Sequence, residues 1–323
     1  MTSEDLKIMQ AWPLERKIRV SQSRIMKWYG HWGGKVYVSF SGGKDSTVLL
    51  DLARRVYPDI EAVFVDTGLE YREVREFALS HSNVTKIKPE KTFREVLTEK
   101  GYPIGSKKVA RMLRTCQNPT DKNEASVRLY RTGIKRDGTK SKNFKLAKKW
   151  LKFIDSEYRA SEECCDVIKK APLKKFGKAT GKKPIIGTMA EDSAFRKINW
   201  LKTGCNAFDV DDPQCKPLSF WTEQDILRYL KLTGIPYCTV YGDIIEKDGK
   251  LATTGEKHTG CIFCLFGVER EKEPNRFQRL KEIDRPKYNY CIGGGEFDQY
   301  GKLIPNKKGL GEGKILDFMG VPY

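Results

Sequence analysis

The sequence lacks any long apolar run. No stretch approaches the roughly 20 consecutive apolar residues that a membrane-spanning helix needs, and the first twenty residues mix acidic and basic side chains without the apolar core of a signal peptide. We therefore expect a soluble protein of the cytoplasm with no membrane partner. The 323 residues, 39% of them hydrophobic, suffice for one large or two modest domains.

Acidic residues are in deficit, because 60 Lys and Arg face 42 Asp and Glu and leave a net charge of +18. The excess is local: residues 100–183 hold 24 basic and 8 acidic side chains. A run of like charge is often only a solvated surface, but it is also typical of a surface that binds nucleic acid or a multiply charged nucleotide. Aromatic residues lie among the bases, as a base-stacking surface requires: Tyr130, Phe144, Trp150, Phe153 and Tyr158.

Short β-rich runs alternate with helical patterns outside this segment. The patterns predict strands at residues 35–40, 60–65, 84–87 and 184–189, and helices at residues 47–56, 70–80, 93–97 and 223–232. Thr222 followed by Asp225 resembles a capping box, with Asp in place of Glu, at the start of the last helix. This alternation is typical of an α/β fold with a doubly wound parallel sheet and helices on both faces.

The domain organisation follows from where the alternation stops. No strand is predicted from about residue 104 to 160, so the basic segment at about 104–183 is expected to be an insertion. We expect an N-terminal helical lead-in over residues 1–34 and an α/β domain over residues 35–240, which the motifs described below indicate to be nucleotide-binding. A cysteine-containing C-terminal region would follow at residues 241–323, with an irregular tail from residue 285 onward.

A turn with two glycines, SGGKDS at residues 41–46, separates the first predicted strand from its helix. Glycines allow successive backbone N–H groups to point into one concavity, and the helix N-terminus adds a partial positive charge. Lys44, Ser41 and Ser46 would add side-chain donors to a phosphate. The spacing is not that of a Walker A loop, and an ordinary turn capped by Asp45 or Ser46 would contain the same residues. Its position at the carboxyl end of a strand favours a phosphate-binding loop.

Two further strand ends are expected at the same edge of the sheet. They carry Asp66-Thr67-Gly68 and Gly187-Thr188-Met189. Because ligands of open α/β sheets bind beside the carboxyl ends of the strands, we expect all three turns to line one crevice.

These motifs together resemble the PP-loop ATP pyrophosphatase superfamily and, more narrowly, the phosphoadenosine phosphosulfate reductase family. The resemblance is carried by VSFSGGKDSTVLLDLA, VFVDTGLEYREV, GTMAEDSAFR, KPLSFWTEQDILRYLKLTGIPY and ECCDVIKKAPLKKF. It implies a Rossmann-like fold of the adenine nucleotide α-hydrolase type. It also implies an enzyme that binds ATP, adenylylsulfate or the 3′-phosphate form of adenylylsulfate, with Mg²⁺ as a further expected cofactor.

The resemblance also implies which residues act. The nucleotide-binding residues would be Ser41, Gly42, Gly43, Lys44, Asp45, Ser46, Asp66, Thr67, Gly68, Gly187, Thr188, Met189 and Arg196. Lys44, Asp45 and Arg196 would take part in catalysis. The planar guanidinium of Arg196 suits a two-point contact with phosphate or sulfate.

Nine cysteines in a cytosolic chain predict buried thiols, metal ligands or redox groups rather than structural disulfides. Cys164 and Cys165 are adjacent, and Cys261 and Cys264 form a C-x-x-C pair. On spacing alone, four thiolates suit zinc or an iron–sulfur cluster. The tandem pair followed by C-x-x-C resembles the four-thiolate site of adenylylsulfate reductases, which implies a [4Fe–4S] cluster on these four residues.

The other cysteines and the three histidines leave alternatives open. Cys116, Cys205 and Cys215 also lie near family motifs and are alternative cluster ligands, whereas Cys238 and Cys291 fit no ligand spacing. A structural role is favoured for His258, which shortly precedes the C-x-x-C pair, and neither His31 nor His81 belongs to a recognisable constellation.

One motif of the assimilatory reductases is absent. Their mobile tail carries a catalytic cysteine in a Glu-Cys-Gly-x-His pattern, whereas the last cysteine here is Cys291, in NYCIGGGEF. The favoured function is therefore ATP activation coupled to sulfur transfer to nucleic acid, as in DNA phosphorothioation. A cysteine desulfurase would supply the sulfur, and residues 100–183 would hold the nucleic acid. The alternatives are a sulfonucleotide reductase that uses Cys291 or an external thiol, with thioredoxin as its partner, and a nucleotide-sensing partner of a DNA-binding regulator.

Overall fold

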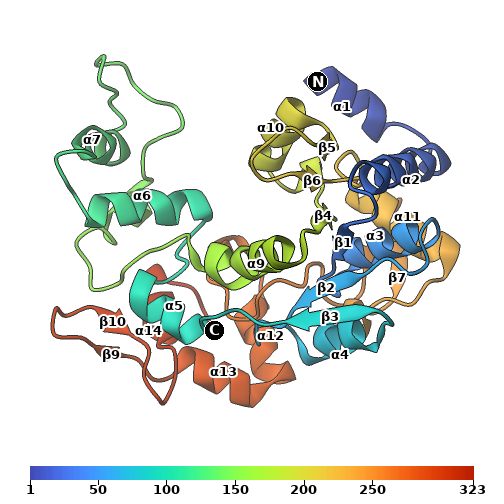
Figure 1. Ribbon diagram of the computed structural model, residues 1–323. Helices are drawn as coiled ribbons and strands as arrows, with labels where there is room; N and C mark the ends of the chain where they lie inside the picture. Colours follow the sequence, from blue (N-terminus) through green and yellow to red (C-terminus); the bar gives the residue numbers. More distant parts are fainter. The chain divides into compact units, whose positions relative to one another are not determined.

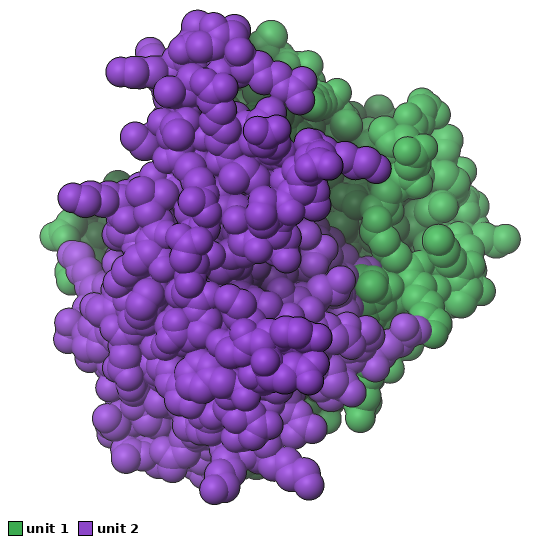
Figure 2. All heavy atoms as spheres, turned by 90° about the vertical axis from the view of Figure 1, so that its left-hand side faces the viewer, with its two compact units in different colours: residues 1–89, 171–260 green, residues 90–170, 261–323 purple.

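The computed structural model describes all 323 residues, which divide into two compact units coloured separately in Figure 2. Unit 1 comprises Met1–Pro89 and Ala171–Gly260, and unit 2 comprises Glu90–Lys170 and Cys261–Tyr323. Each unit is thus assembled from two separate stretches of the sequence. None of the helices combines the length and apolarity that crossing a bilayer requires.

Unit 1 is built on a six-stranded sheet with the strand order β3-β2-β1-β4-β6-β5 (Figure 1). Its strands are β1 (Val36–Ser39), β2 (Ala62–Val65), β3 (Val84–Ile87), β4 (Lys183–Ile186), β5 (Asn206–Ala207) and β6 (Gln214–Cys215). All are parallel except the edge strand β5, and Val38 of β1 lies opposite Ala62 on one side and Ile185 on the other. The order reverses between β1 and β4, so the predicted doubly wound α/β fold is confirmed.

Helices bury both faces of the central strand β1. Val36 and Val38 belong to a core with residues of α2 (Leu14–His31), α3 (Lys44–Arg54), α4 (Arg72–Ser80) and α11 (Glu223–Thr233). Tyr37, between them, packs edge-on against Phe176 of α9 (Ala171–Thr180), with ring centroids 5.2 Å apart. A strand covered on both faces needs apolar side chains at every position, which is why KVYVSF does not alternate.

The remaining elements of unit 1 are short. They are α1 (Ser3–Gln10), α10 (Ala194–Thr203), the 3₁₀ turns η2 (Ala190–Asp192) and η3 (Thr239–Tyr241), and the hairpin of β7 (Ile244–Lys247) and β8 (Lys250–Thr253). The expected capping box of α11 is present. The N–H of Asp225 donates to Thr222 Oγ1 at 3.3 Å, and the Thr222 N–H donates to the Asp225 carboxylate at 2.8 Å.

Unit 2 is mainly helical. It contains α5 (Phe93–Lys100), α6 (Lys107–Gln117), α7 (Glu124–Thr132), α8 (Lys148–Leu151), the π-helical turn η1 (Asp166–Lys170), the 3₁₀ turn η4 (Val268–Arg270), α12 (Arg276–Ile283), α13 (Arg285–Ile292), the hairpin of β9 (Glu296–Phe297) and β10 (Leu303–Ile304), and α14 (Glu312–Met319). As predicted, no strand lies between residues 104 and 160.

The expectation of an irregular tail from residue 285 onward is wrong. The Asp284 side chain caps α13 by accepting from the Lys287 N–H at 3.1 Å, and a proline follows in the first turn, a combination that starts helices. Helix α14 is stabilised by burial of Ile315 and Leu316. The surrounding glycines and lysines give this stretch the composition of an irregular segment, so composition alone reveals neither helix.

A buried ion pair joins the N-terminal helices to α11. Lys17 Nζ lies 2.6 Å from Asp225 Oδ2 and donates to the Gln10 carbonyl at 2.7 Å, and both charged side chains are almost completely buried. Because a buried charge without its partner is costly, this pair fixes where α2 meets α11.

Lys17→Met should lower the free energy of unfolding by about 3–5 kcal/mol, since it leaves the Asp225 carboxylate buried without a cation. The double variant Lys17→Met/Asp225→Asn should recover part of that loss. Urea unfolding measures both, and Lys7→Ala, which removes an exposed ion pair with Glu4, is the control with an expected change of about 0.5 kcal/mol or less. Equal unfolding free energies for Lys17→Met and Lys7→Ala would contradict the assignment.

Candidate functional site

The SGGKDS turn connects β1 to α3 and closes on itself through side chains. The Ser41 N–H donates to Ser46 Oγ at 3.2 Å, the Ser41 and Ser46 hydroxyls are 3.1 Å apart, and Ser46 Oγ donates to the Gly43 carbonyl at 2.9 Å. Gly42 has φ +72°, and a Cβ there would lie 2.7 Å from the Val74 carbonyl oxygen of α4. Only glycine fits this backbone and this approach.

The first turn of α3 presents unpaired donors beside this loop. The Lys44 N–H is satisfied by the Tyr241 hydroxyl at 3.1 Å, whereas the N–H groups of Asp45 and Ser46 donate to no protein acceptor. Unpaired N–H groups at a helix start, together with the partial positive charge of the helix, favour an anion. The loop and the helix start therefore form an anion-binding geometry.

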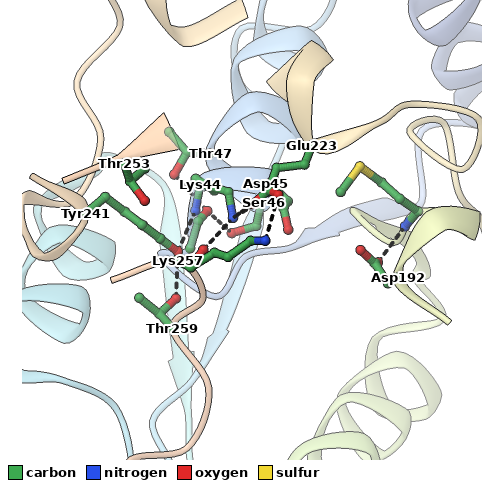
Figure 3. A network of polar contacts seen from close by, with 12 residues as sticks. Lys44, Asp45, Ser46, Thr47, Asp192, Glu223, Tyr241, Thr253, Lys257 and Thr259 are labelled. Atoms are coloured by element: carbon green, nitrogen blue, oxygen red, sulfur yellow. Dashed lines mark hydrogen bonds and ion pairs between the residues drawn. The ribbon is translucent and has the colours of Figure 1, made fainter. Parts of the chain in front are cut away.

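Lys44 is the centre of the polar network in Figure 3. Its side chain is 2% exposed, and Nζ donates to the Lys257 carbonyl at 2.8 Å. Two carboxylates lie further away, Asp45 Oδ1 at 3.8 Å and Glu223 Oε1 at 3.6 Å. The ammonium is thus buried but held loosely by its acidic neighbours, so an anionic ligand could compete with them for it.

Residues 241–259 pack directly against the glycine loop, since a Cβ at Gly43 would lie 3.1 Å from Thr259 Oγ1 and 3.2 Å from the Tyr241 hydroxyl. The Tyr241 hydroxyl lies 2.7 Å from Thr259 Oγ1, and the Lys44 ammonium lies 5.4 Å from the Tyr241 ring centroid. Burial raises the pKa of Tyr241 to about 12, so the hydroxyl stays protonated. Tyr241 thus accepts the Lys44 N–H and shares a second hydrogen bond with the Thr259 hydroxyl, in which either oxygen can donate.

Two titratable groups beside Lys44 are shifted towards their neutral forms. Burial raises the pKa of Asp45, against the opposing charge of Lys44, and Oδ1 of Asp45 is shielded from solvent without a hydrogen bond. Burial, with Lys44 second, lowers the pKa of His258, which is therefore a neutral imidazole near neutral pH. A buried carboxylate oxygen that accepts no hydrogen bond is a candidate ligand for a cation.

The second strand end carries Asp66, Thr67 and Gly68, as the sequence indicated. Asp66 is held by Arg75 of α4, with three nitrogen–oxygen distances of 3.0–3.1 Å. Thr67 Oγ1 donates to Glu70 at 2.6 Å. These contacts fix the turn. They also mean that the side chains of Asp66 and Thr67 already bind other residues of the protein.

The third strand end follows β4 with Gly187, Thr188 and Met189. A Cβ on Gly187 would lie 3.4 Å from the Asp45 carbonyl oxygen, so this turn lies directly beside the start of α3. The Met189 N–H donates to Asp192 Oδ2 at 3.1 Å, and Asp192 also pairs with Arg196 of α10. The Arg196 side chain is 45% exposed. The structure thus brings the ends of β1 and β4 together, and Arg196 lies one helical turn beyond the β4 turn, paired with an acid.

All four cysteines expected to bind a cluster lie in unit 2. The adjacent thiols of Cys164 and Cys165 interact, and this interaction raises the pKa of Cys164 and lowers that of Cys165. Cys261 and Cys264 are near enough for their charges to raise the pKa of Cys164 further. No group of three or more His, Cys, Asp or Glu side chains is arranged to hold a metal ion.

The other cysteines are buried and none forms a disulfide. Cys116 lies on α6 in unit 2, and Cys205 and Cys215 lie in the core of unit 1. Cys291 is fully buried, and its Sγ lies 2.9 Å from Glu312 Oε2. Burial raises the pKa of Cys291, and the neighbouring Glu312 raises it further.

Several residues of the network were not predicted from the sequence: Lys257, Thr259, Tyr241, Glu223 and Asp192. Three of them come from a stretch about 200 positions after the glycine loop, which has no motif of its own. Glu223 could have been found, because the predicted capping box places it in the first turn of α11.

Gly42→Ala should destabilise the protein more than Gly234→Ala does. Both glycines have positive φ, which costs alanine about 1–2 kcal/mol, but nothing lies within 4 Å of a Cβ at Gly234. The contact with the Val74 carbonyl adds to the cost only at Gly42. Urea unfolding of the two variants tests the difference. Equal losses of unfolding free energy would mean that the contact with the Val74 carbonyl adds no cost at Gly42.

Comparison with known proteins finds a family match over the residues that form this site. The phosphoadenosine phosphosulfate reductase domain matches residues 35–143 and 107–256. The chain is 24% identical over 217 residues to adenosine 5′-phosphosulfate reductase of Geobacillus thermodenitrificans, which covers 66% of this chain and 70% of the relative. An uncharacterized protein of Methanocaldococcus jannaschii is 38% identical over 97 residues, 28% of this chain and 24% of the relative.

The remaining similarities are shorter or more distant. Adenosine 5′-phosphosulfate reductase of Bacillus velezensis is 43% identical over 53 residues, 16% of this chain and 23% of the relative. The chain thus covers less than a quarter of the length of the first curated relatives that it matches. A crystal structure of phosphoadenylyl-sulfate reductase from Candida auris is 12% identical with a TM-score of 0.38, covering 76% of this chain and 96% of that one.

The two domain matches together run from residue 35 to residue 256, over both the glycine loop and the α10–α11 region that completes its surroundings. The chain belongs to the phosphoadenosine phosphosulfate reductase family.

Proposed function

We propose that the chain is an enzyme that binds ATP by its phosphates at the β1–α3 loop and activates an acceptor by releasing pyrophosphate. The observation that carries this proposal is the pair of unpaired N–H groups at the start of α3 beside the buried Lys44 ammonium. These donors lie at the carboxyl end of β1, next to the point where the strand order reverses, where ligands of such sheets bind.

In the proposed reaction, an acceptor oxygen attacks the α-phosphorus of ATP. The bond from that phosphorus to the oxygen bridging to the β-phosphate breaks, and pyrophosphate leaves with the bonding electron pair. Lys44 would exchange its loose contacts with Asp45 and Glu223 for the phosphates and offset the charge that develops. Arg196 would exchange Asp192 for the α-phosphate, a change open to it because its side chain is half-exposed.

Mg²⁺ is the expected companion of the phosphates. Asp45 fits it, because its Oδ1 is shielded from solvent and accepts no hydrogen bond. When bound, Mg²⁺ would neutralise charge on the leaving pyrophosphate.

The acceptor proposed is a nucleic acid, and the step that follows is sulfur transfer. The adenylylated acceptor would exchange AMP for sulfur from a persulfide made by a cysteine desulfurase, and a thiol reductant would then cleave the remaining S–S bond. The form of the sulfonucleotide reductase alternative that uses Cys291 as its nucleophile has less support. That thiol is fully buried beside Glu312, and burial disfavours the thiolate that would attack.

We also propose that Cys164, Cys165, Cys261 and Cys264 hold a [4Fe–4S] cluster. The donor set fits, since all four thiols belong to unit 2 and influence one another electrostatically. Four cysteine thiolates are the ligand set that a [4Fe–4S] cluster would take. When bound, the cluster would supply electron transfer or position the substrate.

The purified protein should release pyrophosphate from ATP, and Lys44→Met should reduce kcat by about 100-fold or more, as loss of a charge-stabilising donor does. Lys231→Met, at an exposed lysine of α11, is the matched control and should retain activity. A coupled pyrophosphate assay measures both. Sulfite release from adenylylsulfate with thioredoxin, without ATP turnover, would establish the reductase instead.

Protein purified without oxygen should be brown and contain four iron and four sulfide per chain. Cys164→Ser should lose the visible absorption, whereas Cys116→Ser should keep it if the four proposed cysteines are the ligands. Iron and sulfide analysis with visible spectroscopy makes the comparison. A colourless wild-type protein with stoichiometric zinc would contradict the cluster.

A further inference from the structure

Unit 2 carries an exposed basic surface formed by α6, α7 and residues 133–149, here called the α6–α7 surface. Residues 107–149 contain 14 Lys and Arg and only 3 Asp and Glu. Within unit 2, only Arg114, Arg131 and Lys149 of these cations pair with an acid. The other eleven have no acidic partner, so this charge is available to a polyanion.

The segment that bears much of this charge has a defined backbone. The Ser141 N–H donates to the Gly133 carbonyl at 2.7 Å, and the Leu146 N–H donates to the Tyr130 carbonyl at 2.8 Å. Ser141 Oγ accepts the Phe144 N–H at 3.1 Å. The loop is therefore fixed to the end of α7, and binding need not pay the full entropic cost of ordering it.

One aromatic ring stands open on this surface. Phe144 is 47% exposed, with Lys108 Nζ of α6 at 4.9 Å from its ring centroid and the Tyr130 ring of α7 at 6.4 Å. The other aromatic residues of the basic segment are not available, because Trp150, Phe153 and Tyr158 are buried in unit 2. The stacking surface expected from the sequence is thus reduced to Phe144, with Tyr130 beside it.

We propose that the α6–α7 surface binds single-stranded nucleic acid, with phosphates on its free cations and a base stacked on Phe144. Single strands fit better than a duplex, because only an unstacked base can offer its face to the ring. An acidic protein would satisfy the cations but would leave the exposed ring without a partner of matching shape. The inference rests on the proposed function in one respect, since it names the surface that would hold the acceptor.

The binding test uses the full chain without ATP and fluorescence anisotropy of labelled oligonucleotides of about 20 nucleotides, long enough to span one site. Oligothymidylate and oligouridylate distinguish DNA from RNA, and a duplex of the same length is compared with both. We expect either single strand to bind more tightly than the duplex, with log K falling by about 0.7 per phosphate contact for each decade of salt. Duplex binding as tight as that of both single strands would overturn the proposal.

Phe144→Ala should raise the Kd for the preferred single strand by about 5- to 100-fold, the usual effect of removing one stacked base contact. Tyr300→Ala is the matched control, because Tyr300 is an aromatic residue of unit 2 that is 76% exposed and lies outside the α6–α7 surface. An effect of Phe144→Ala no larger than that of Tyr300→Ala would show that no base stacks on Phe144 and would refute the proposal.

The double variant Lys140→Glu/Lys142→Glu should weaken binding and reduce the steepness of the salt dependence by about 1.4, the value for two phosphate contacts. Lys307→Glu/Lys308→Glu changes the charge of unit 2 equally at other exposed lysines and should have little effect. Equal losses from the two double variants would overturn the assignment of the surface. Pyrophosphate release without oligonucleotide binding would refute this inference alone, and binding without pyrophosphate release would refute only the proposed reaction.

Discussion

The burial of the Lys44 ammonium is the constraint on which the candidate site depends. A charge that is 2% exposed must be surrounded by acceptors, and here they come from three separate parts of unit 1: Asp45 beside it on α3, Glu223 on α11 and the Lys257 carbonyl. Satisfying one lysine therefore requires α3, α11 and the chain after β8 to meet. The same requirement holds Tyr241 against the first turn of α3, where it accepts the Lys44 N–H.

Much of this frame could be predicted from the sequence, because it rests on local signals. Buried strands β1 and β2, the glycine turn and the capping box of Thr222 and Asp225 each have a short pattern with a direct physical cause. The partners of Lys44 could not be predicted in the same way. A backbone carbonyl such as that of Lys257 acts whatever its side chain is, and Tyr241 reaches Lys44 across 197 positions. The helices of the tail were missed for a related reason, since burial in unit 2 rather than periodicity stabilises α14.

Residues of the basic segment that look equivalent in the sequence have different surroundings in the structure. Its aromatic residues all look alike in the sequence, yet Phe153 packs against Phe318 in the core, with ring centroids 4.8 Å apart, while Phe144 remains at the surface. Its cations divide likewise: Arg114 is committed to Glu162, whereas the lysines of the loop after α7 have no acid to bind. Charge and aromatic content alone therefore overstate the size of a binding surface. Only those charged and aromatic side chains that are exposed and unpaired can contact a ligand.

The missing side chain at Gly42 has a consequence for the dimensions of the loop. Because a Cβ at Gly42 would lie 2.7 Å from the Val74 carbonyl oxygen, the loop backbone lies close to α4, and α4 limits how far the loop can move towards it. A substitution in α4 that moves the Val74 carbonyl towards Gly42 should therefore disturb the loop, even with every residue of SGGKDS unchanged. The packing of α4, through Val74 and Ala78 in the core, thus helps to hold the loop in its conformation from outside its own sequence.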